Sequence, residues 1–159
     1  MGATKAPGSD SRQEVEAARR ASEARFRTLA EESPVILWAR DARGDVEFTN
    51  RAFRDFYGVT AEEVEGTGWR PTVHPEDAPW FEECALSAIR EHKPFTCEVR
   101  VRRADGEWRW ICAYGRPRFG EAEEFLGHVG ISVDVTDRKR AEERCGRTTG
   151  TSDPSRHQN

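Results

Sequence analysis

Residues 95–112 read FTCEVRVRRADGEWRWIC, and this stretch decides the fold. Over residues 95–102 apolar and polar side chains alternate, which is the period of a strand with one buried face. Residues 128–135 repeat this alternation, with valine or isoleucine at every second position. The pattern therefore predicts strand, turn, strand, loop and strand in this part of the chain.

The Asp-Gly pair at residues 105–106 sets the expected register of the first two strands. Both residue types tolerate a positive φ, as a two-residue hairpin loop requires. With this loop, Val101 lies opposite Trp110, and Val99 lies opposite Cys112. Apolar side chains then face one another, whereas a slip of one residue would pair each with a polar neighbour.

The part of the chain before residue 33 predicts a leader and one helix. Residues 1–9 are small and polar, and we expect them to be disordered. Residues 10–32 have the period of an amphipathic helix with a narrow apolar seam, which docks on the domain, dimerises as a short coiled coil, or does both. The residues of this expected dimer helix are Val15, Ser22, Phe26 and Leu29.

Residues 33–136 carry the expected domain. Two strands come first, then several short helices and a longer helix that opens at the His-Pro pair of residues 74–75, and then the three strands described above. Runs of strands on both sides of a block of helices indicate an α+β fold with an antiparallel sheet. A last helix is expected over residues 137–145 with Thr136 as its cap, followed by a disordered tail over residues 146–159.

Size and composition narrow the class of protein. A chain of 159 residues with 34% charged residues has room for one modest core. The net charge of -4 argues against a nucleic-acid partner, because phosphate binding needs a concentrated basic face. No apolar run approaches the roughly 20 residues of a membrane span, and no secretory signal opens the chain, so we expect no membrane partner and a cytoplasmic location.

The four cysteines show no CxxC spacing, and three of them lie inside periodic apolar patterns. This suits small buried hydrophobic side chains in a reducing compartment. The expectation is therefore neither a structural disulfide nor a metal cluster.

Eight short motifs resemble, in order and spacing, those of a known family. They are Ser33-Pro34, Asp41 with Gly44, Asn50-Arg51-Ala52-Phe53, His74-Pro75-Glu76-Asp77, Glu98-Val99-Arg100, Arg103-Ala104-Asp105-Gly106, Trp108-Arg109-Trp110 and Gly130-Ile131-Ser132-Val133-Asp134-Val135-Thr136. Over residues 22–143 the chain resembles PAS sensor domains with a trailing PAC segment, of the subclass common in bacterial signalling proteins such as sensor histidine kinases and cyclases. The resemblance implies a five-stranded antiparallel sheet in spatial order 2-1-5-4-3, with helices over one face enclosing a small cavity. It also implies a sensory or dimerisation role in signal transduction.

A ligand in such a fold would lie between the inner face of the sheet and the helices. The candidate lining residues are Trp38, Asn50, Phe53, Phe56, Trp69, Phe81, Cys84, Arg100, Trp110 and Ile131. For the three phenylalanines, core packing is the competing interpretation. An inward Arg100 would need a carboxylate from the protein or from a ligand, and its alternative is an outward position on a solvated strand. Asn50 alternatively caps the helix that follows it.

The resemblance also bears on cofactors and catalysis. Flavin-binding relatives carry a reactive cysteine in a segment that here reads GTGWRPT over residues 66–72, without a cysteine. Haem-binding relatives take an axial histidine from the long helix, and residues 76–91 contain none. We therefore expect no tightly bound cofactor and no metal, although the ligand stays unidentified. No hydrolytic triad, phosphate loop or carboxylate pair emerges, so we expect no enzymatic activity in this chain.

The resemblance assigns Asp134, Val135 and Thr136 to the segment that couples the sheet to an output helix. The resulting hypothesis is a cytoplasmic PAS-type module, homodimeric through its N-terminal helix and outer sheet face, that binds a small ligand or a partner protein such as a kinase. Its alternatives are a haem- or flavin-bearing sensor and a structural dimerisation scaffold with a filled cavity. Since the output helix is expected to stop near Cys145, the chain is expected to be either a piece of a longer sensor or a stand-alone protein that acts on a partner.

Overall fold

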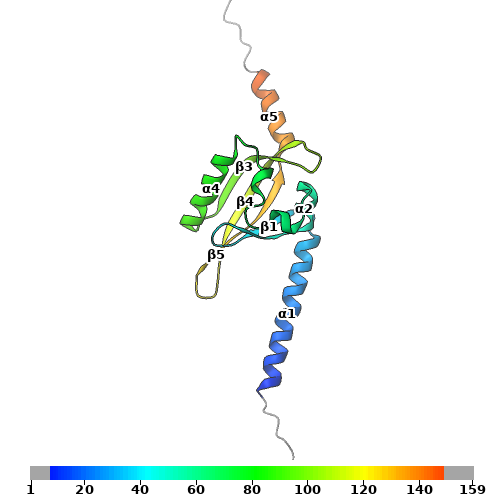
Figure 1. Cartoon of the computed structure of the whole chain (residues 1–159), viewed down its shortest axis with the longest axis vertical. Helices are drawn as coiled ribbons and strands as arrows, with labels where there is room; N and C mark the ends of the chain where they lie inside the picture. Colours follow the sequence, from blue (N-terminus) through cyan, green and yellow to red (C-terminus); the bar gives the residue numbers. More distant parts are fainter. Residues whose placement is uncertain (1–7, 149–159) are drawn as a thin grey trace, which may run out of the picture.

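The computed structural model describes residues 8–148. In order, the elements are α1 (Ser9–Glu32), β1 (Ile36–Arg40), β2 (Val46–Thr49), α2 (Arg51–Tyr57), α3 (Ala61–Val64), the 3-10 helix η1 (Arg70–Thr72), α4 (Ala78–Glu91), β3 (Phe95–Arg102), β4 (Trp108–Phe119), β5 (Phe125–Asp134) and α5 (Thr136–Thr148) (Figure 1). Most of the expected leader and tail, residues 1–7 and 149–159, lies outside the described residues. Residues 146–148 belong to α5, so the prediction that the helix ends at Cys145 is wrong.

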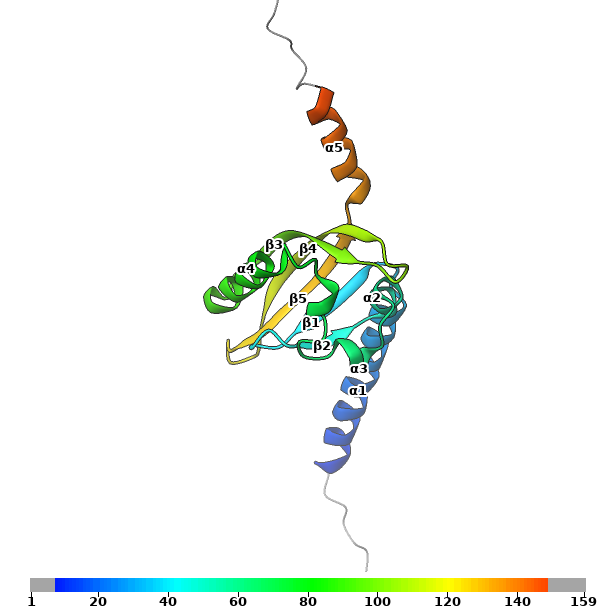
Figure 2. The same ribbon diagram turned by 45° about the horizontal axis from the view of Figure 1, so that its top comes forward.

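The predicted sheet is confirmed. The described residues form a five-stranded sheet in the order β2-β1-β5-β4-β3, and each neighbouring pair of strands is antiparallel. Figure 2 shows α2, α3 and α4 over one face of this sheet. Helices α1 and α5 extend away from it at opposite ends of the molecule (Figure 1).

The predicted register of the β3–β4 hairpin is wrong by one residue. Val99 lies opposite Ile111, and Val101 lies opposite Arg109. The loop covers residues 103–107 instead of two residues, and a hydrogen bond of 2.9 Å from its first amide to its last carbonyl closes it. A loop with an odd number of residues exchanges the two faces of β4 relative to the prediction, because side chains alternate along a strand.

The core lies between the inner face of the sheet and the helices that cover it. It consists of Ile36, Trp38, Val46, Phe53, Val64, Trp69, Val73, Phe81, Cys97, Val99, Val101, Ile111 and Ala113. On the outer face of the sheet, apolar side chains of β4 and β5 stay exposed, with exposed fractions of 38–45% for Tyr114, Val129, Ile131 and Val133. The sheet therefore presents apolar side chains on both faces, and only one face is covered by the described residues of this chain.

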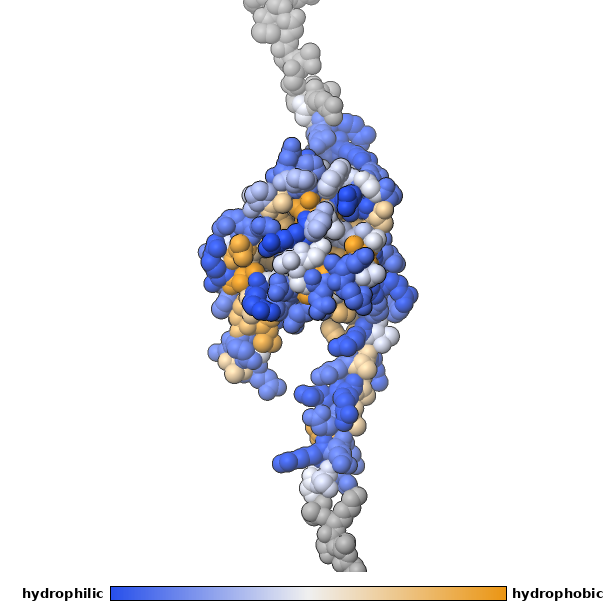
Figure 3. Space-filling view, in the orientation of Figure 1, coloured by the Kyte–Doolittle hydropathy of each residue, from blue (hydrophilic) through white to orange (hydrophobic). Residues whose placement is uncertain are grey.

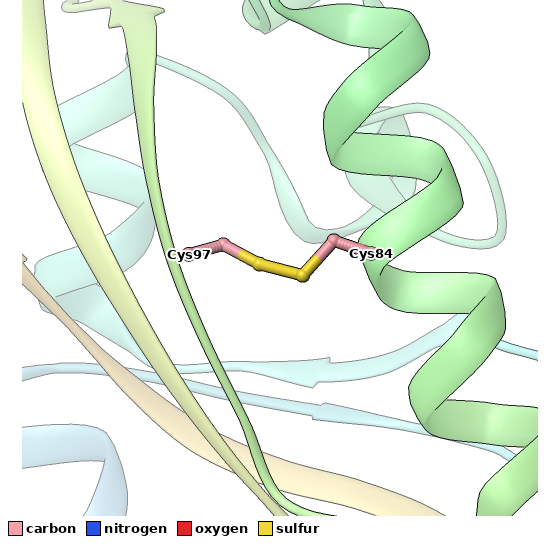
Figure 4. The surroundings of a disulfide bond; sticks show 2 residues. All are labelled: Cys84 and Cys97. Atoms are coloured by element: carbon pink, nitrogen blue, oxygen red, sulfur yellow. A yellow bond between two sulfur atoms is a disulfide. The ribbon is translucent and has the colours of Figure 1, made fainter.

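A disulfide joins Cys84 on α4 to Cys97 on β3 (Figure 4). The prediction that all four cysteines are free is wrong for this pair. The two residues are 13 positions apart and carry no spacing signal, but packing of α4 against β3 brings their side chains together. Of the other two, Cys112 is buried and free, and Cys145 is exposed and free.

No helix in the described part of the chain is long and apolar enough to cross a membrane. Likewise, His, Cys, Asp and Glu side chains within residues 8–148 form no group of three or more that could hold a metal ion.

Candidate functional site

A cavity of about 40 Å³ lies under the covering helices, against the inner face of the sheet. Its wall is formed by Trp38, Arg40, Val46, Phe53, Tyr57, Trp69, Thr72, Val73, Phe81, Val99, Val101, Ile111, Ala113 and Ser132. These residues come from all five strands and from α2, α4 and the segment that contains η1. The site is thus assembled from distant parts of the sequence.

The wall includes four of the ten candidates from the sequence, namely Trp38, Phe53, Trp69 and Phe81. Trp38 and Phe81 lie on opposite sides of the cavity, on β1 and α4. The Trp38 indole Nε1 donates a hydrogen bond of 3.0 Å to the Ser132 hydroxyl, which fixes the ring against β5. The other six candidates lie elsewhere.

Asn50 is fully buried and makes structural hydrogen bonds. Its side-chain oxygen accepts hydrogen bonds from the amides of Phe53 at 3.1 Å and Leu37 at 3.0 Å. Its side-chain nitrogen donates to the carbonyl oxygens of Ala30 at 3.0 Å and Val35 at 2.8 Å. The capping alternative is therefore the one observed, and Asn50 also ties the end of α1 to β1 and α2.

Arg100 lies outside the cavity, and the inward alternative for this residue is wrong. Its guanidinium Nε and one terminal nitrogen donate to the two carboxylate oxygens of Asp77 at 3.0 and 2.7 Å, and the same terminal nitrogen donates to Glu76 at 3.1 Å. The hydrogen bond from Arg100 is the main reason why the pKa of Asp77 is lowered, although burial opposes it. This ion pair holds the start of α4 against β3.

Trp110 and Ile131 point to the outer face of the sheet, so their assignment to the cavity is wrong. The changed register turns Trp110 outward, where it lies opposite Arg100. Ile131 lies opposite the exposed Tyr114. The inward position on β5 belongs to Ser132. Valine or isoleucine at alternate positions of β5 therefore marks the outer face, contrary to the usual expectation that the more apolar set faces the core.

The last two candidates pack beside the cavity without lining it. Cys84 is held in the disulfide with Cys97. Phe56 is partly buried and contacts Tyr57 edge-to-face, with ring centroids 5.1 Å apart. Core packing is therefore the role that the structure gives to Phe56.

Arg40, which the sequence reasoning missed, enters the cavity wall. Its guanidinium carbon lies 4.5 Å from the centroid of the Trp69 ring, 5.3 Å from that of Trp38 and 5.7 Å from that of Phe81. As a whole residue Arg40 is partly exposed, but its Nε is inaccessible to solvent and has no hydrogen-bond partner. A signal existed, because Arg40 follows Trp38 by two positions on β1 and so must share its face.

Burial changes the acid-base chemistry of this site. It lowers the pKa of Arg40 from 12.5 to about 10, because the charged form loses its hydration. Burial also raises the pKa of Tyr57, whose ring borders the same cavity. Among the described residues that line the cavity, none is an aspartate or glutamate. Within this cavity, the positive charge of Arg40 therefore faces aromatic rings and no carboxylate.

A second buried donor borders the same space. The indole Nε1 of Trp69 is buried without a hydrogen-bond partner, and the residue is only 8% exposed. The Trp69 ring packs edge-to-face against Phe81, with centroids 5.3 Å apart. Two unsatisfied nitrogen donors thus meet at one cavity, which is unusual because buried polar groups are nearly always hydrogen-bonded.

The three residues expected to couple the sheet to the last helix form a hydrogen-bonded junction. The Thr136 hydroxyl accepts a hydrogen bond of 2.9 Å from the Trp110 amide and donates one of 2.5 Å to the Asp134 carboxylate. Asp134 also accepts from the Thr136 amide at 2.9 Å and from Arg109 at 2.8 Å. Val135 continues the pairing, since its amide donates to the Trp110 carbonyl at 2.8 Å. Thr136 is the first residue of α5, and Asp134 supplies the side chain that accepts from its amide.

Ion pairs attach the first turns of α5 to the β3–β4 hairpin. Glu98 on β3 pairs with Lys139 at 2.5 Å and with Arg138, and Glu107 pairs with Arg140 at 2.8 Å. The hydrogen bond from Lys139, with a further one from Arg138, lowers the pKa of Glu98. The direction in which α5 leaves the sheet is therefore held by side chains from β3 and from the loop between β3 and β4.

The apolar seam of α1 is not covered by the described residues. The exposed fractions are 69% for Val15, 74% for Phe26 and 67% for Leu29, Ser22 is exposed as well, and α1 has no buried residue. Figure 3 shows α1 as a mainly hydrophilic surface with a few hydrophobic side chains. Only the C-terminal end of α1 contacts the domain, through Asn50 and α2. The structure therefore does not show α1 docked along its own domain.

Comparison with known proteins agrees with the fold. Residues 46–132 match the PAS fold family. A sensory box histidine kinase/response regulator from Burkholderia thailandensis, a solved structure, superimposes with a TM-score of 0.58 at 30% identity, covering 79% of this chain and 95% of that one. This chain belongs to the PAS fold family, and it is related to the sensor portions of signalling proteins.

Two curated relatives are much longer than this chain. The uncharacterized protein y4lL of Sinorhizobium fredii is 37% identical over 84% of this chain, which spans 16% of that relative. The peroxide stress-activated histidine kinase mak2 of Schizosaccharomyces pombe is 27% identical over 73% of this chain, which spans 5% of that relative.

Proposed function

We propose that this chain is a sensory and dimerisation module of a two-component or similar signalling protein, which takes a small ligand in its cavity and transmits the response through α5. The family and the histidine kinases among its relatives support a role in signal transduction. A PAS domain is not itself catalytic, so this chain would serve a kinase or another signalling partner. We also propose that it acts in the cytoplasm, where a histidine kinase partner would find its ATP and where the Cys84–Cys97 disulfide would be open to reduction by cellular thiols.

One observation carries the proposed output. Ser132 lines the cavity on β5, and Asp134, two residues further along the same strand, holds the start of α5. A displacement of β5 at Ser132 would therefore reach α5 through a few covalent bonds. The pairs of Glu98 and Glu107 with α5 would make the helix direction sensitive to the β3–β4 hairpin as well.

Two apolar surfaces support the homodimer. The seam of α1 exposes Val15, Phe26 and Leu29, and the outer sheet face exposes Ile131 and Val133. An isolated amphipathic helix with an uncovered seam is stabilised by packing on a copy of itself. A second copy of this chain would cover both surfaces.

Light scattering with size-exclusion chromatography tests the dimer. The wild type is expected to elute as a dimer across a wide concentration range, and Phe26→Glu to shift it towards monomer, because the added charge lies on the apolar seam. Thr28→Glu is the matched control, since Thr28 is also exposed on α1 and lies roughly opposite Phe26 around the helix. A monomeric wild type would overturn the dimer, as would a Phe26→Glu variant as dimeric as the control.

The cavity size favours a second candidate, a structural dimerisation scaffold with a filled core. A volume of about 40 Å³ has room for no more than a few waters or one molecule of a few heavy atoms. If no small molecule raises the melting temperature, the scaffold is the better description, because a ligand of the native state must stabilise it by mass action. The same volume does not accommodate a haem or a flavin, and we do not propose either cofactor.

A further inference from the structure

We infer that the cavity takes a small monocarboxylate, whose charged group pairs with the Arg40 guanidinium and the Trp69 indole nitrogen. This inference rests on the proposed ligand-binding function, and it specifies the chemical class of the ligand. Among the described residues that line the cavity, no carboxylate is present to pair with Arg40.

The charge of Arg40 is the first argument. A guanidinium has five N–H donors, and the Nε donor of Arg40 is buried without a hydrogen-bond partner. The three aromatic rings around it attract a cation but offer no strong acceptor. An uncompensated buried charge is costly, and an anion in the cavity would satisfy both the charge and the donors.

The second argument is the position of Trp69. Its Nε1 donor is buried and unpartnered, and it belongs to the ring that lies nearest to the Arg40 guanidinium, at 4.5 Å from the ring centroid. A carboxylate has two oxygens and can accept from two donors on different side chains at once. A single neutral carbonyl would leave the charge of Arg40 uncompensated.

The part of the cavity away from Arg40 limits the size and polarity of the rest of the ligand. Away from Arg40, the wall is mostly apolar and includes Val73, Val99 and Ile111. With about 40 Å³ of space, the ligand has room for little more than the carboxylate and a short hydrocarbon group. Acetate has this combination of charge and size.

A route into the cavity lies beside the same two residues. Arg40 and Trp69 also border a separate surface pocket of about 60 Å³. Arg43 and Arg70 on its wall are paired with Asp45 and Glu82, so the pocket as a whole does not favour anions. Arg40 and Trp69 nevertheless stand between the surface and the cavity, and a small molecule that passes through this pocket would meet Arg40 directly.

Isothermal titration calorimetry with sodium acetate, using the dialysed full chain at constant ionic strength, tests the inference. Acetate is expected to bind the wild type, and Arg40→Gln is expected to weaken binding at least tenfold, because a hydrogen bond to a charged group contributes about 1.5–3 kcal/mol. Arg102→Gln is the matched control: it removes the same charge from an exposed position on β3 and is expected to bind acetate as the wild type does.

Other ligands and variants define what would overturn the inference. Acetamide, which has the shape of acetate without its charge, and sodium chloride are expected to bind at least tenfold more weakly than acetate, and equal binding of either one contradicts a carboxylate site. Trp69→Phe keeps an aromatic ring but removes the Nε1 donor, so its affinity for acetate is expected to fall several-fold. This variant tests the site if Arg40→Gln fails to fold. The proposal is contradicted if the wild type shows no detectable acetate binding, or if Arg40→Gln binds acetate as tightly as the wild type does.

A second readout separates this inference from the proposed output. Hydrogen exchange of the amides in residues 136–142 is compared with and without acetate. If acetate binds through Arg40 and the exchange does not change, the ligand class holds and the proposed output through α5 fails. If acetate does not bind while another small molecule changes the exchange, the ligand class fails and the output proposal holds.

Discussion

Replacing Arg40 by methionine should stabilise the ligand-free protein. The lowering of the Arg40 pKa from 12.5 to about 10 by burial corresponds to roughly 3 kcal/mol against the charged form. Cation–π contacts with the three rings offset about 1–2 kcal/mol of this desolvation cost. Methionine fills similar space without charge or donors, and its sulfur also packs well on aromatic rings. The net expectation for Arg40→Met is a gain of about 1–2 kcal/mol in the free energy of unfolding.

Urea and thermal unfolding, followed by circular dichroism on extensively dialysed protein, measure this gain. For a domain of this size it amounts to an increase of roughly 4–8 °C in Tm. Arg102→Met is the control, because Arg102 is exposed and its substitution should change stability by less than ~0.5 kcal/mol.

The stability difference between Arg40→Met and the wild type should depend on pH in a defined direction. Because the pKa of Arg40 is lower in the folded protein than in the unfolded chain, its destabilising effect is fully present below pH 10 and declines as the pH rises from about 10 towards 12.5. The difference in stability between Arg40→Met and the wild type should therefore narrow in this range. Titrations of groups that do not interact with Arg40 cancel in the comparison, whereas Tyr57 borders the same cavity and is influenced by the Arg40 charge.

The reasoning would be refuted by an Arg40→Met variant that is less stable than the wild type by more than about 1 kcal/mol while Arg102→Met is unchanged. That result would mean that the guanidinium has favourable partners inside the free protein. The ligand inference would then lose its first argument.

Two further predictions concern the disulfide and the attachment of α5. Cys84→Ala should lower the free energy of unfolding by about 3 kcal/mol, since the disulfide to Cys97 closes a loop with a sequence separation of 13; urea unfolding with and without reductant measures this, and a wild type that reductant leaves unchanged would contradict it. Glu98→Gln should speed amide exchange in the first turns of α5 while changing global stability by about 1 kcal/mol or less. Because the pKa of Glu98 is lowered in the folded state, the wild type should lose this protection as the pH falls below 4.5, and equal exchange rates in both proteins at neutral pH would count against the role of the pair.

Local chemistry in the sequence was enough to predict the framework. The alternation over residues 95–102 and 128–135 predicts strands, and the order of strands and helices predicts an α+β sheet. Asn50 caps α2, which is one of the two alternatives that the sequence left open for it. These features depend on residues close together in the chain, so their patterns are readable without a structure. The resemblance to PAS domains then supplied the order of the strands.

Much of the site could not be read in this way. β4 carries apolar side chains on both faces, so its pattern does not say which face is buried, and one additional register step turns Trp110 outward. On β5 the alternation is clear, but the valines and isoleucine lie on the exposed outer face. Ile131 was misplaced for the same reason, because the face of β5 that the helices cover is the one with Ser132.

The tertiary structure alone decided the two most consequential features. The disulfide forms because α4 packs on β3, which no spacing of Cys84 and Cys97 reveals. Arg40 ends a strand and resembles a solvated residue in the sequence, yet η1 and α4 place Trp69 and Phe81 over it. Local patterns determine which residues form each strand and helix, whereas the burial of a charge depends on which distant side chains pack around it.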